Sequence, residues 1–260
     1  MTDTQKREHY QERGYKPFLF YVVFGTSGKD LEVSASRHHA DGLPAGLSLQ
    51  ALSRRDNAAY IEGFFAGAVG NILKGTAPEL YEKCKNTDDC VILKGEVEEH
   101  RTLDYMRNVI GILQALLEQG GVGVLDLMTF TLYSPEDFKE RFFEKEVNAQ
   151  NHAFILASKE KEGYWLHTRG MAAFGRPDYS LHVSEEDLFE EYKDILDQMI
   201  YYGGQGVFFD GEYRLHTHSG KTYRISARYV EDFNNDDFNN AYSEVTLVEE
   251  EETVPQEVIH

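Results

Sequence analysis

The sequence predicts an α+β fold in which two consecutive sheet-plus-helix modules pack as one compact body, with mostly antiparallel sheet. Short apolar runs, which are typical of buried strands, recur along the chain. Between them lie segments whose apolar residues recur at helical spacing, and glycines or prolines separate the two kinds of segment. Helices that cover sheets are the arrangement expected from such a pattern.

Composition divides the chain into four parts. Residues 1–16 are polar and are expected to form a loosely docked lead-in, and residues 17–133 are expected to form the first α+β module. Residues 134–248 form the second predicted module, which contains a central hairpin, and residues 249–260 are an acidic tail. A chain of 260 residues is long enough to bury a sizeable core.

In the first module, the continuous apolar run over residues 18–24 predicts a strand buried on both faces. Residues 25–30 resemble a phosphate-binding loop but are too short for the motif and lack Ser or Thr after Lys29, so the turn of a hairpin is expected instead. Helices are predicted over residues 48–73 and 102–119, and further strands over 90–97 and 123–133.

In the second module, Ser134 and Pro135 mark the start of a helix, since serine is a good N-cap and proline suits the first helical position. Residues 164–169 and 179–183 alternate as strands do, around a turn that contains Gly170, Gly175 and Pro177. A helix with an acidic outer face over residues 185–197 follows, and then strands over 207–209, 212–218, 222–230 and 242–248.

Composition also restricts the class of protein. The chain is 41% hydrophobic and 13% aromatic, which is typical of a globular protein, and it has no apolar run of membrane-spanning length. Its first residues are polar, so no secretory leader is expected and a cytoplasmic location is predicted. The spacing of Cys84 and Cys90 fits neither a zinc knuckle nor a redox pair, and no cofactor is expected.

The net charge of −19 is unevenly distributed. Residues 231–260 hold ten acids and no Lys or Arg, and residues 184–197 hold seven acids and one Lys. The remaining chain is nearly balanced, so the acidity indicates a solvated helix face and a solvated tail. No basic stripe interleaved with aromatic residues is present, so nucleic-acid binding is not expected.

The hairpin over residues 164–183 holds the main candidates for a functional site, because it gathers the only tryptophan with histidines, arginines and an aspartate. If it is catalytic, His167 or His182 would be the general acid or base and Asp178 would orient it. Arg169 and Arg176 would bind an anion. Trp165 and the distant Asn239 are further candidates for ligand contact. The alternative is structural: an Arg–Asp pair that clamps a long turn.

A weaker pattern concerns metal binding. His216 and His218 lie two residues apart in a predicted strand, so both side chains are expected on one face, where they could share a metal ion. An exposed polar strand face beside Arg214 is the simpler interpretation, and no metal is expected.

Residues 168–170 are Thr-Arg-Gly, and residues 174–178 are Phe-Gly-Arg-Pro-Asp. In these motifs the chain resembles an uncharacterised bacterial domain family, and residues 113–127 and 237–240 also fit it. The resemblance covers roughly residues 100–248. It implies the fold and a bacterial origin, and it carries over no activity and no catalytic residue. Families of this kind often occur in accessory, defence or toxin-immunity neighbourhoods.

The chain has no nucleophile elbow, zinc-binding helix, phosphate loop or kinase signature. The leading hypothesis is therefore an accessory or immunity-like protein-binding module, with the acidic helix over residues 185–197 as the contact surface. The alternative is a small-ligand-binding protein or enzyme that uses the hairpin over residues 164–183. Whether the chain is an enzyme, and its oligomeric state, are left open.

Overall fold

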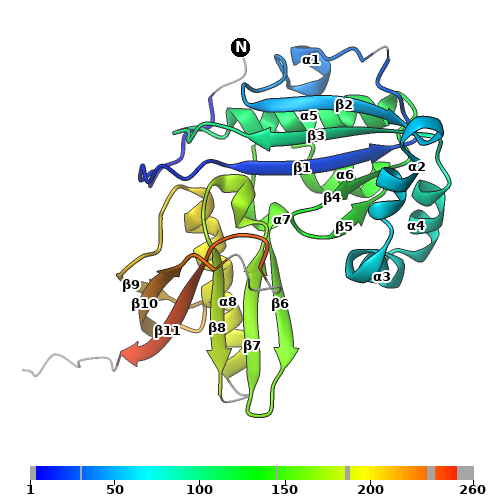
Figure 1. The fold of residues 1–260 in the computed structure, drawn as a ribbon. Helices are drawn as coiled ribbons and strands as arrows, with labels where there is room; N and C mark the ends of the chain where they lie inside the picture. The colour runs from blue at the N-terminus through cyan, green and yellow to red at the C-terminus, as the bar shows by residue number, and fades with distance from the viewer. Residues whose placement is uncertain (1–3, 30, 145, 185–187, 233–237, 251–260) are drawn as a thin grey trace, which may run out of the picture.

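Two β-sheets form the frame of the molecule in the computed structural model (Figure 1). The structure describes residues 4–29, 31–144, 146–184, 188–232 and 238–250. The first sheet belongs to the first predicted module and the second sheet to the second. Both sheets are mostly antiparallel and both carry helices, which confirms the predicted α+β class.

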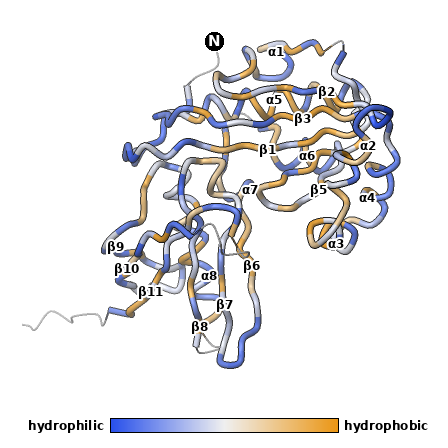
Figure 2. The backbone as a smooth tube through the Cα atoms, in the orientation of Figure 1, coloured by the Kyte–Doolittle hydropathy of each residue, from blue (hydrophilic) through white to orange (hydrophobic). Residues whose placement is uncertain are grey.

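The first sheet has the strand order β2-β3-β1-β4-β5 and is antiparallel throughout. Its strands are β1 (Phe18–Phe24), β2 (Leu47–Ser53), β3 (Asp89–Glu96), β4 (Gly123–Asp126) and β5 (Thr131–Tyr133). The apolar run of β1 occupies the centre because helices cover both faces of this sheet (Figures 1 and 2). Tyr21 and Val23 point to one hydrophobic cluster, whereas Val22 and Phe24 point to the other.

Helices form a layer on each face of the first sheet. On one face lie α5 (Asp104–Glu118) and α6 (Pro135–Phe142), with the short α1 (Ala35–His38) against α5. On the other face lie α2 (Arg54–Gly63), α3 (Gly67–Thr76) and α4 (Pro78–Lys85). Helix α6 begins as predicted, since the Ser134 hydroxyl accepts a hydrogen bond from the Asp137 backbone N–H.

The second sheet has the order β6-β7-β8-β11-β10-β9, in which β8 and β11 run parallel. Its strands are β6 (Phe154–Lys159), β7 (Tyr164–Arg169), β8 (Asp178–Val183), β9 (Glu212–His216), β10 (Thr222–Val230) and β11 (Tyr242–Glu250). The predicted hairpin is confirmed as β7 and β8, joined by a 3-10 turn, η1 (Met171–Phe174). The short α7 (Ala149–His152) precedes β6.

Helix α8 (Phe189–Gly204) covers one face of the second sheet. Phe189 packs edge-on against Tyr164 of β7, and Tyr192 packs edge-on against Tyr223 of β10. Because side chains alternate along a strand, Trp165 of β7 points to the opposite face, and so does His182, its partner on β8. Among the described elements no helix packs on that opposite face, which we call the open face.

A single hydrophobic cluster joins the two modules. It contains Val109 of α5, Phe174 of η1, and Met199 of α8, all with less than 1% of their surface exposed. The core therefore continues from the first sheet through η1 to the second sheet, so the two modules pack as one body.

The N-terminal segment was expected to be loosely docked, and this prediction is wrong over residues 4–16. Arg7 is 4% exposed, and its guanidinium donates hydrogen bonds to the backbone carbonyls of Phe174, Gly203 and Gly204. The last carbonyls of a helix have no partner within the helix, and Arg7 supplies one from a distant part of the chain. A polar sequence alone does not reveal such a capping role.

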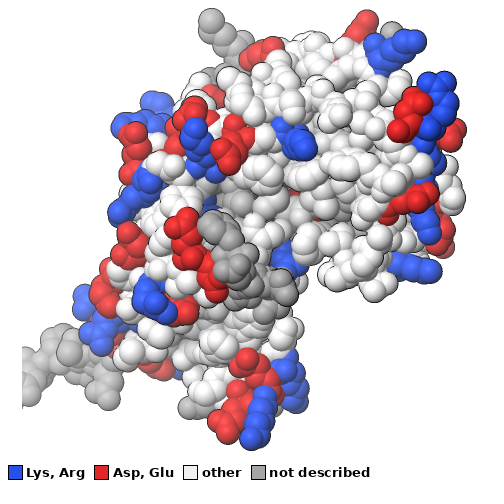
Figure 3. Space-filling view, viewed as in Figure 1, with Lys and Arg blue, Asp and Glu red and all other residues white. Residues whose placement is uncertain are grey.

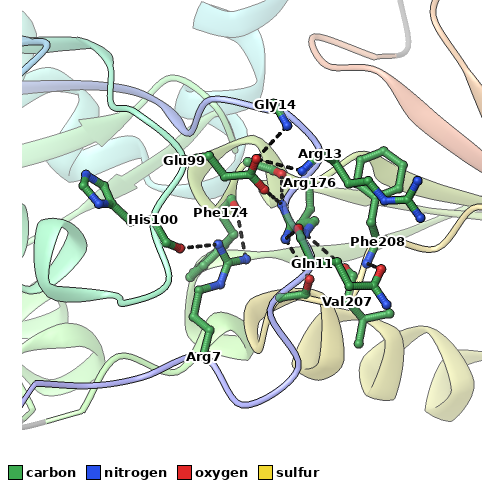
Figure 4. Close-up of polar contacts among 12 residues, drawn as sticks. Arg7, Gln11, Arg13, Gly14, Glu99, His100, Phe174, Arg176, Val207 and Phe208 are labelled. Carbon is green, nitrogen blue, oxygen red and sulfur yellow. Dashed lines mark hydrogen bonds and ion pairs between the residues drawn. The ribbon is translucent and has the colours of Figure 1, made fainter.

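A second buried arginine joins four segments of the chain (Figure 4). The Arg176 side chain is fully buried, and its Nη1 lies 2.9 Å from Oε1 of Glu99. It also donates to the carbonyls of Gln11 and Gly206, and the other Glu99 oxygen accepts from the backbone N–H of Gly14 at 2.7 Å. We call Arg7, Glu99 and Arg176 the arginine clamp.

Several predicted boundaries are wrong in the first module. Residues 48–53 belong to strand β2, not to a helix, because β2 pairs along its whole length with β3. The hairpin predicted around residues 25–30 is absent from the described residues there, since β1 pairs with β3 and β4 and Ser34 caps α1. The strand predicted over residues 123–133 is two strands, separated by a turn in which Phe130 has φ of +53°.

Boundaries also differ in the second module. Residues 207–209 are not a strand, and β9 ends at His216. Glu249 and Glu250, which were assigned to the acidic tail, belong to β11, where Glu250 pairs with Thr222. Residues 251–260 lie outside the described part of the chain.

The arginine clamp implies that two neighbouring glutamates, Glu98 and Glu99, contribute very differently to the free energy of unfolding. Glu99→Ala leaves the Arg176 guanidinium buried without its counter-charge, so we expect the free energy of unfolding to fall by about 3–5 kcal/mol. Glu98 forms an exposed pair with Lys16, so we expect Glu98→Ala to cost less than about 1 kcal/mol. Urea denaturation of the two variants measures both values, and equal losses would contradict the role given to Glu99.

A pH prediction follows from His152, whose ring packs between Phe142 and Phe174. Burial, together with the nearby Arg141 charge, lowers the pKa of His152 from 6.5 to about 3. The unfolded chain therefore binds more protons between these values, and stability is lost as the pH falls through this window. Burial raises the pKa of Asp126 and of Asp178 to about 6, which has the opposite effect on the pH dependence.

We expect His152→Phe to remove only the histidine contribution. Between about pH 4 and pH 6, the free energy of unfolding of wild type should fall more steeply with acid than that of the variant, by about 1.4 kcal/mol per pH unit. Denaturation curves at a series of pH values test this. Parallel curves for the two proteins would show that His152 does not titrate in this way.

Candidate functional site

Two of the predicted site residues are structural. Arg176 belongs to the buried arginine clamp and is closed to any ligand. Asp178 is 1% exposed, and its carboxylate accepts hydrogen bonds from Thr168 Oγ1 at 3.0 Å, the Met171 backbone N–H at 3.2 Å and Asn240 Nδ2 at 3.0 Å. Asp178 holds the two ends of the hairpin turn together and contacts neither histidine of the hairpin in these bonds.

Two further candidates connect the modules. The Arg169 guanidinium lies over the ring of Phe130, with 4.6 Å between the guanidinium carbon and the ring centroid. Asn239 Nδ2 donates to the Met128 carbonyl at 3.1 Å. Both side chains therefore contact the turn between β4 and β5.

Two other candidates, Trp165 and His182, line a hollow of about 500 Å³ on the open face. We call it the aromatic pocket. Its lining residues are Glu160, Trp165, Ser180, His182, Phe238, Tyr242, Glu244, Val245 and Thr246. They come from the turn between β6 and β7, from the hairpin, from β11 and from the segment that precedes β11. A volume of this size accommodates a long side chain or a small molecule.

The β7–β8 register builds the first wall of the pocket. Trp165 lies directly opposite His182, and their rings are nearly parallel with centroids 6.3 Å apart. The indole also stacks on the buried His167 ring, with centroids 4.1 Å apart, and the indole N–H donates to Ser180 Oγ at 2.9 Å. These contacts fix the orientation of the indole plane.

Phe238 and Tyr242 build the second wall. Their rings stack with centroids 4.2 Å apart, and the Phe238 ring meets Trp165 at a steep angle, with centroids 5.9 Å apart. Tyr242 is placed here because the parallel pairing of β11 with β8 sets it beside Asp178, at the end of the hairpin. Phe238 and Tyr242 are both nearly buried, so Trp165 and His182 supply the accessible aromatic surface.

Two carboxylates complete the lining of the pocket. Glu160 Oε2 lies 2.9 Å from His182 Nδ1, and Glu244 forms an ion pair with Arg228 of β10. The described lining contains no Lys or Arg. In the view of Figure 3, charged side chains of both signs gather over β9 to β11 and at the turn between β6 and β7, and the described surface between these two groups is mostly uncharged. Aromatic faces beside carboxylates favour a bound cation.

The same pocket holds Ser180, His182 and Glu160, the residue types of a hydrolytic triad. However, Ser180 Oγ accepts its hydrogen bond from Trp165, and no described hydrogen bond joins His182 to Ser180. An activated serine requires its base within hydrogen-bonding distance, so this arrangement does not provide a nucleophile.

The histidines proposed as weak metal ligands do not share a strand face. His216 is the last residue of β9, and its Nδ1 lies 2.8 Å from Thr222 Oγ1. His218 lies in the following turn and pairs with Asp194 of α8. Strand β9 ends two residues earlier than the alternation indicated, before a turn that contains Gly220. Within the described residues no group of three or more metal-ligating side chains is found.

The acidic helix proposed as a contact surface uses its carboxylates within the chain. Of residues 185–197, the first three lie outside the described residues. Glu191 accepts from Ser219 Oγ, Asp194 binds His218, and Asp197 accepts from Gln150. These acids join α8 to the β9–β10 turn and to α7.

Sequence reasoning missed Glu160, Phe238, Tyr242 and Glu244. The alternation over residues 242–248 places Tyr242 and Glu244 on one face, which was a usable signal. Their convergence with Trp165 depends on the pairing of β11 with β8, which no local pattern indicates.

Comparison with protein-family models, with curated proteins and with solved structures finds no match to this chain. In the described part of the chain, no helix has the length and apolar character needed to cross a membrane. The pocket itself is therefore the basis for a functional proposal.

The two pocket histidines are expected to respond differently to removal. His167 is buried under the indole, so His167→Ala should lower the free energy of unfolding by about 2 kcal/mol or more. The His182 side chain is 66% exposed, so His182→Ala should change it by less than about 0.5 kcal/mol. Thermal and urea denaturation measure both. A large loss in the His182 variant would show that this side of the pocket is structural.

Proposed function

We propose that the protein is a protein-binding module that takes a lysine or arginine side chain of a partner polypeptide into the aromatic pocket. The observation that carries the proposal is the combination of Trp165, presented on an accessible face, with the carboxylates of Glu160 and Glu244 in one lining. A cation over an aromatic ring gains about 0.5–2 kcal/mol, and tryptophan is the strongest aromatic partner.

The surroundings of the pocket support a polypeptide as the ligand. The open face extends from β6 to β9 beside the pocket, so a chain segment could lie across it. Tryptophan and arginine are among the residues that dominate the energetics of protein interfaces, and the open face presents both. The net charge of −19 would also attract a basic partner over a distance.

The contact surface proposed here is the aromatic pocket and not the acidic helix that the sequence suggests. The described carboxylates of α8 bind neighbouring segments of the same chain and line no hollow that is described here, whereas Glu160 and Glu244, although each also pairs within the chain, line the aromatic pocket. An accessory or immunity-like role in a bacterial cytoplasm remains a prediction from the sequence.

A small cationic ligand is the second candidate, and the Glu160–His182 pair favours it. A carboxylate that holds one imidazole nitrogen orients the ring, which is the arrangement used for general acid–base catalysis. In that case the same pocket would bind a free amine or guanidine, with His182 as the catalytic group.

The test uses the fluorescence of Trp165, the only tryptophan in the chain, as the reporter. We expect a glycine-flanked lysine or arginine peptide to change this fluorescence saturably, and the glutamine analogue to have no effect. Glu160→Gln and Glu244→Gln should each weaken binding by about 5- to 10-fold, because each removes one attractive charge.

The matched control is Glu82→Gln, which removes an exposed carboxylate from α4 in the other module and should leave the affinity unchanged. Equal affinity for the glutamine peptide, or binding of a single-stranded oligonucleotide in place of the basic peptides, would contradict the proposal. If N-acetyl-lysine methylamide binds as tightly as the peptides, the small-ligand candidate is favoured.

A further inference from the structure

A second hollow lies next to the aromatic pocket on the open face and has the opposite charge. It has a volume of about 670 Å³, and we call it the arginine hollow. Its lining residues are Glu212, Tyr213, Arg214, Arg224, Ser226, Thr246 and Val248. Thr246 lines both hollows, so the two are adjacent on the face.

The strand register places two like charges side by side in the arginine hollow. Arg214 of β9 lies directly opposite Arg224 of β10. Like charges at directly opposed positions of an antiparallel pair destabilise the sheet. Glu250 relieves one of them, because its carboxylate lies 3.0 Å from Arg214 Nε.

Arg224 is left as the available donor. Its side chain is exposed, and it forms no ion pair or hydrogen bond with any residue that the structure describes. Glu212 lines the same hollow as a single opposing carboxylate. A guanidinium in this state binds a carboxylate through two parallel hydrogen bonds. An added carboxylate would therefore also relieve the repulsion between the two arginines.

We infer that the partner segment carries an acidic residue about three positions from its basic one, and that Arg224 binds this second carboxylate. The basic half of this inference rests on the function proposed above. The aromatic pocket lies over β8 and β11, and the arginine hollow lies over β10 and β9. Their centres are thus about two strand spacings, or roughly 10 Å, apart, which an extended peptide spans in about three residues.

The charges of the two linings support a single segment with both signs. The described lining of the aromatic pocket has two carboxylates and no Lys or Arg, whereas that of the arginine hollow has two guanidinium groups and one carboxylate. A uniformly basic segment would meet Arg224 unfavourably, and a uniformly acidic one would meet Glu160 and Glu244 unfavourably. A segment with both charges matches both hollows.

The test compares glycine-flanked Lys-Gly-Gly-Glu and Glu-Gly-Gly-Lys with their glutamine analogues, in which Glu is replaced by Gln. We expect one of the two glutamate-containing peptides to bind the wild-type protein about 10-fold more tightly than its glutamine analogue binds. Arg224→Gln should abolish that advantage and leave the affinity of the glutamine analogue unchanged. The control is Arg55→Gln, which removes an exposed guanidinium in the other module and should preserve the advantage.

The inference is overturned if each glutamate-containing peptide and its glutamine analogue bind wild type equally tightly. It is also overturned if the tighter binding of the glutamate-containing peptide persists in the Arg224→Gln protein. If no lysine peptide binds, the proposed function fails, and a second experiment then tests Arg224 by itself. In this experiment a glycine-flanked glutamate peptide without lysine is added, and the NMR signal of the Arg224 Nε–H is followed. A shift that saturates supports the anion site, and an unchanged signal overturns it.

Discussion

The position of the open face depends on one buried ion pair, between Arg176 and Glu99. Arg176 stands at the junction of η1 and β8, and Glu99 stands in the loop after β3, so the pair joins the two sheets directly. A lone charge in this environment would be strongly unfavourable, and the carbonyls and amides around both side chains satisfy their remaining hydrogen bonds. Arg7 adds a second link, to the end of α8.

From this constraint the geometry of the aromatic pocket follows. With the start of β8 held by the clamp and by Asp178, the β7–β8 register sets Trp165 opposite His182. The parallel pairing of β11 then brings Tyr242 and Glu244 to the same place. Because α8 covers the other face, these side chains remain on a surface that other molecules can reach. The hairpin residues that build the frame and those that line the pocket are therefore different, although they lie within a few positions of each other.

Much of the fold could be predicted from sequence because it depends on local patterns. The apolar run of β1, the capped start of α6 and the strand–turn–strand over residues 164–183 all rely on periodicity and turn chemistry. Residues 48–53 could not be assigned from periodicity, because their strand conformation depends on pairing with β3, far along the chain. Arg7 was missed for a similar reason, since its partners are carbonyls at the end of a helix almost two hundred residues away.

The site was predicted only in part for the same physical reason. Trp165 and His182 follow from alternation within one hairpin, and they are found together. Arg176 and Asp178 have the residue types of a site but serve the turn, which sequence alone left open. The carboxylates and the second aromatic pair come from other strands, and only the sheet order brings them in.

Two-dimensional NMR during titration with a glycine-flanked lysine peptide tests the central claim most directly, namely that the ligand lies on the open face at Trp165. The single indole N–H signal and the amide signals of Ser180, His182 and Glu244 should shift together and saturate at one affinity, while the signals of α8 stay in place. Shifts confined to α8, with an unchanged indole signal, would contradict this account of the protein.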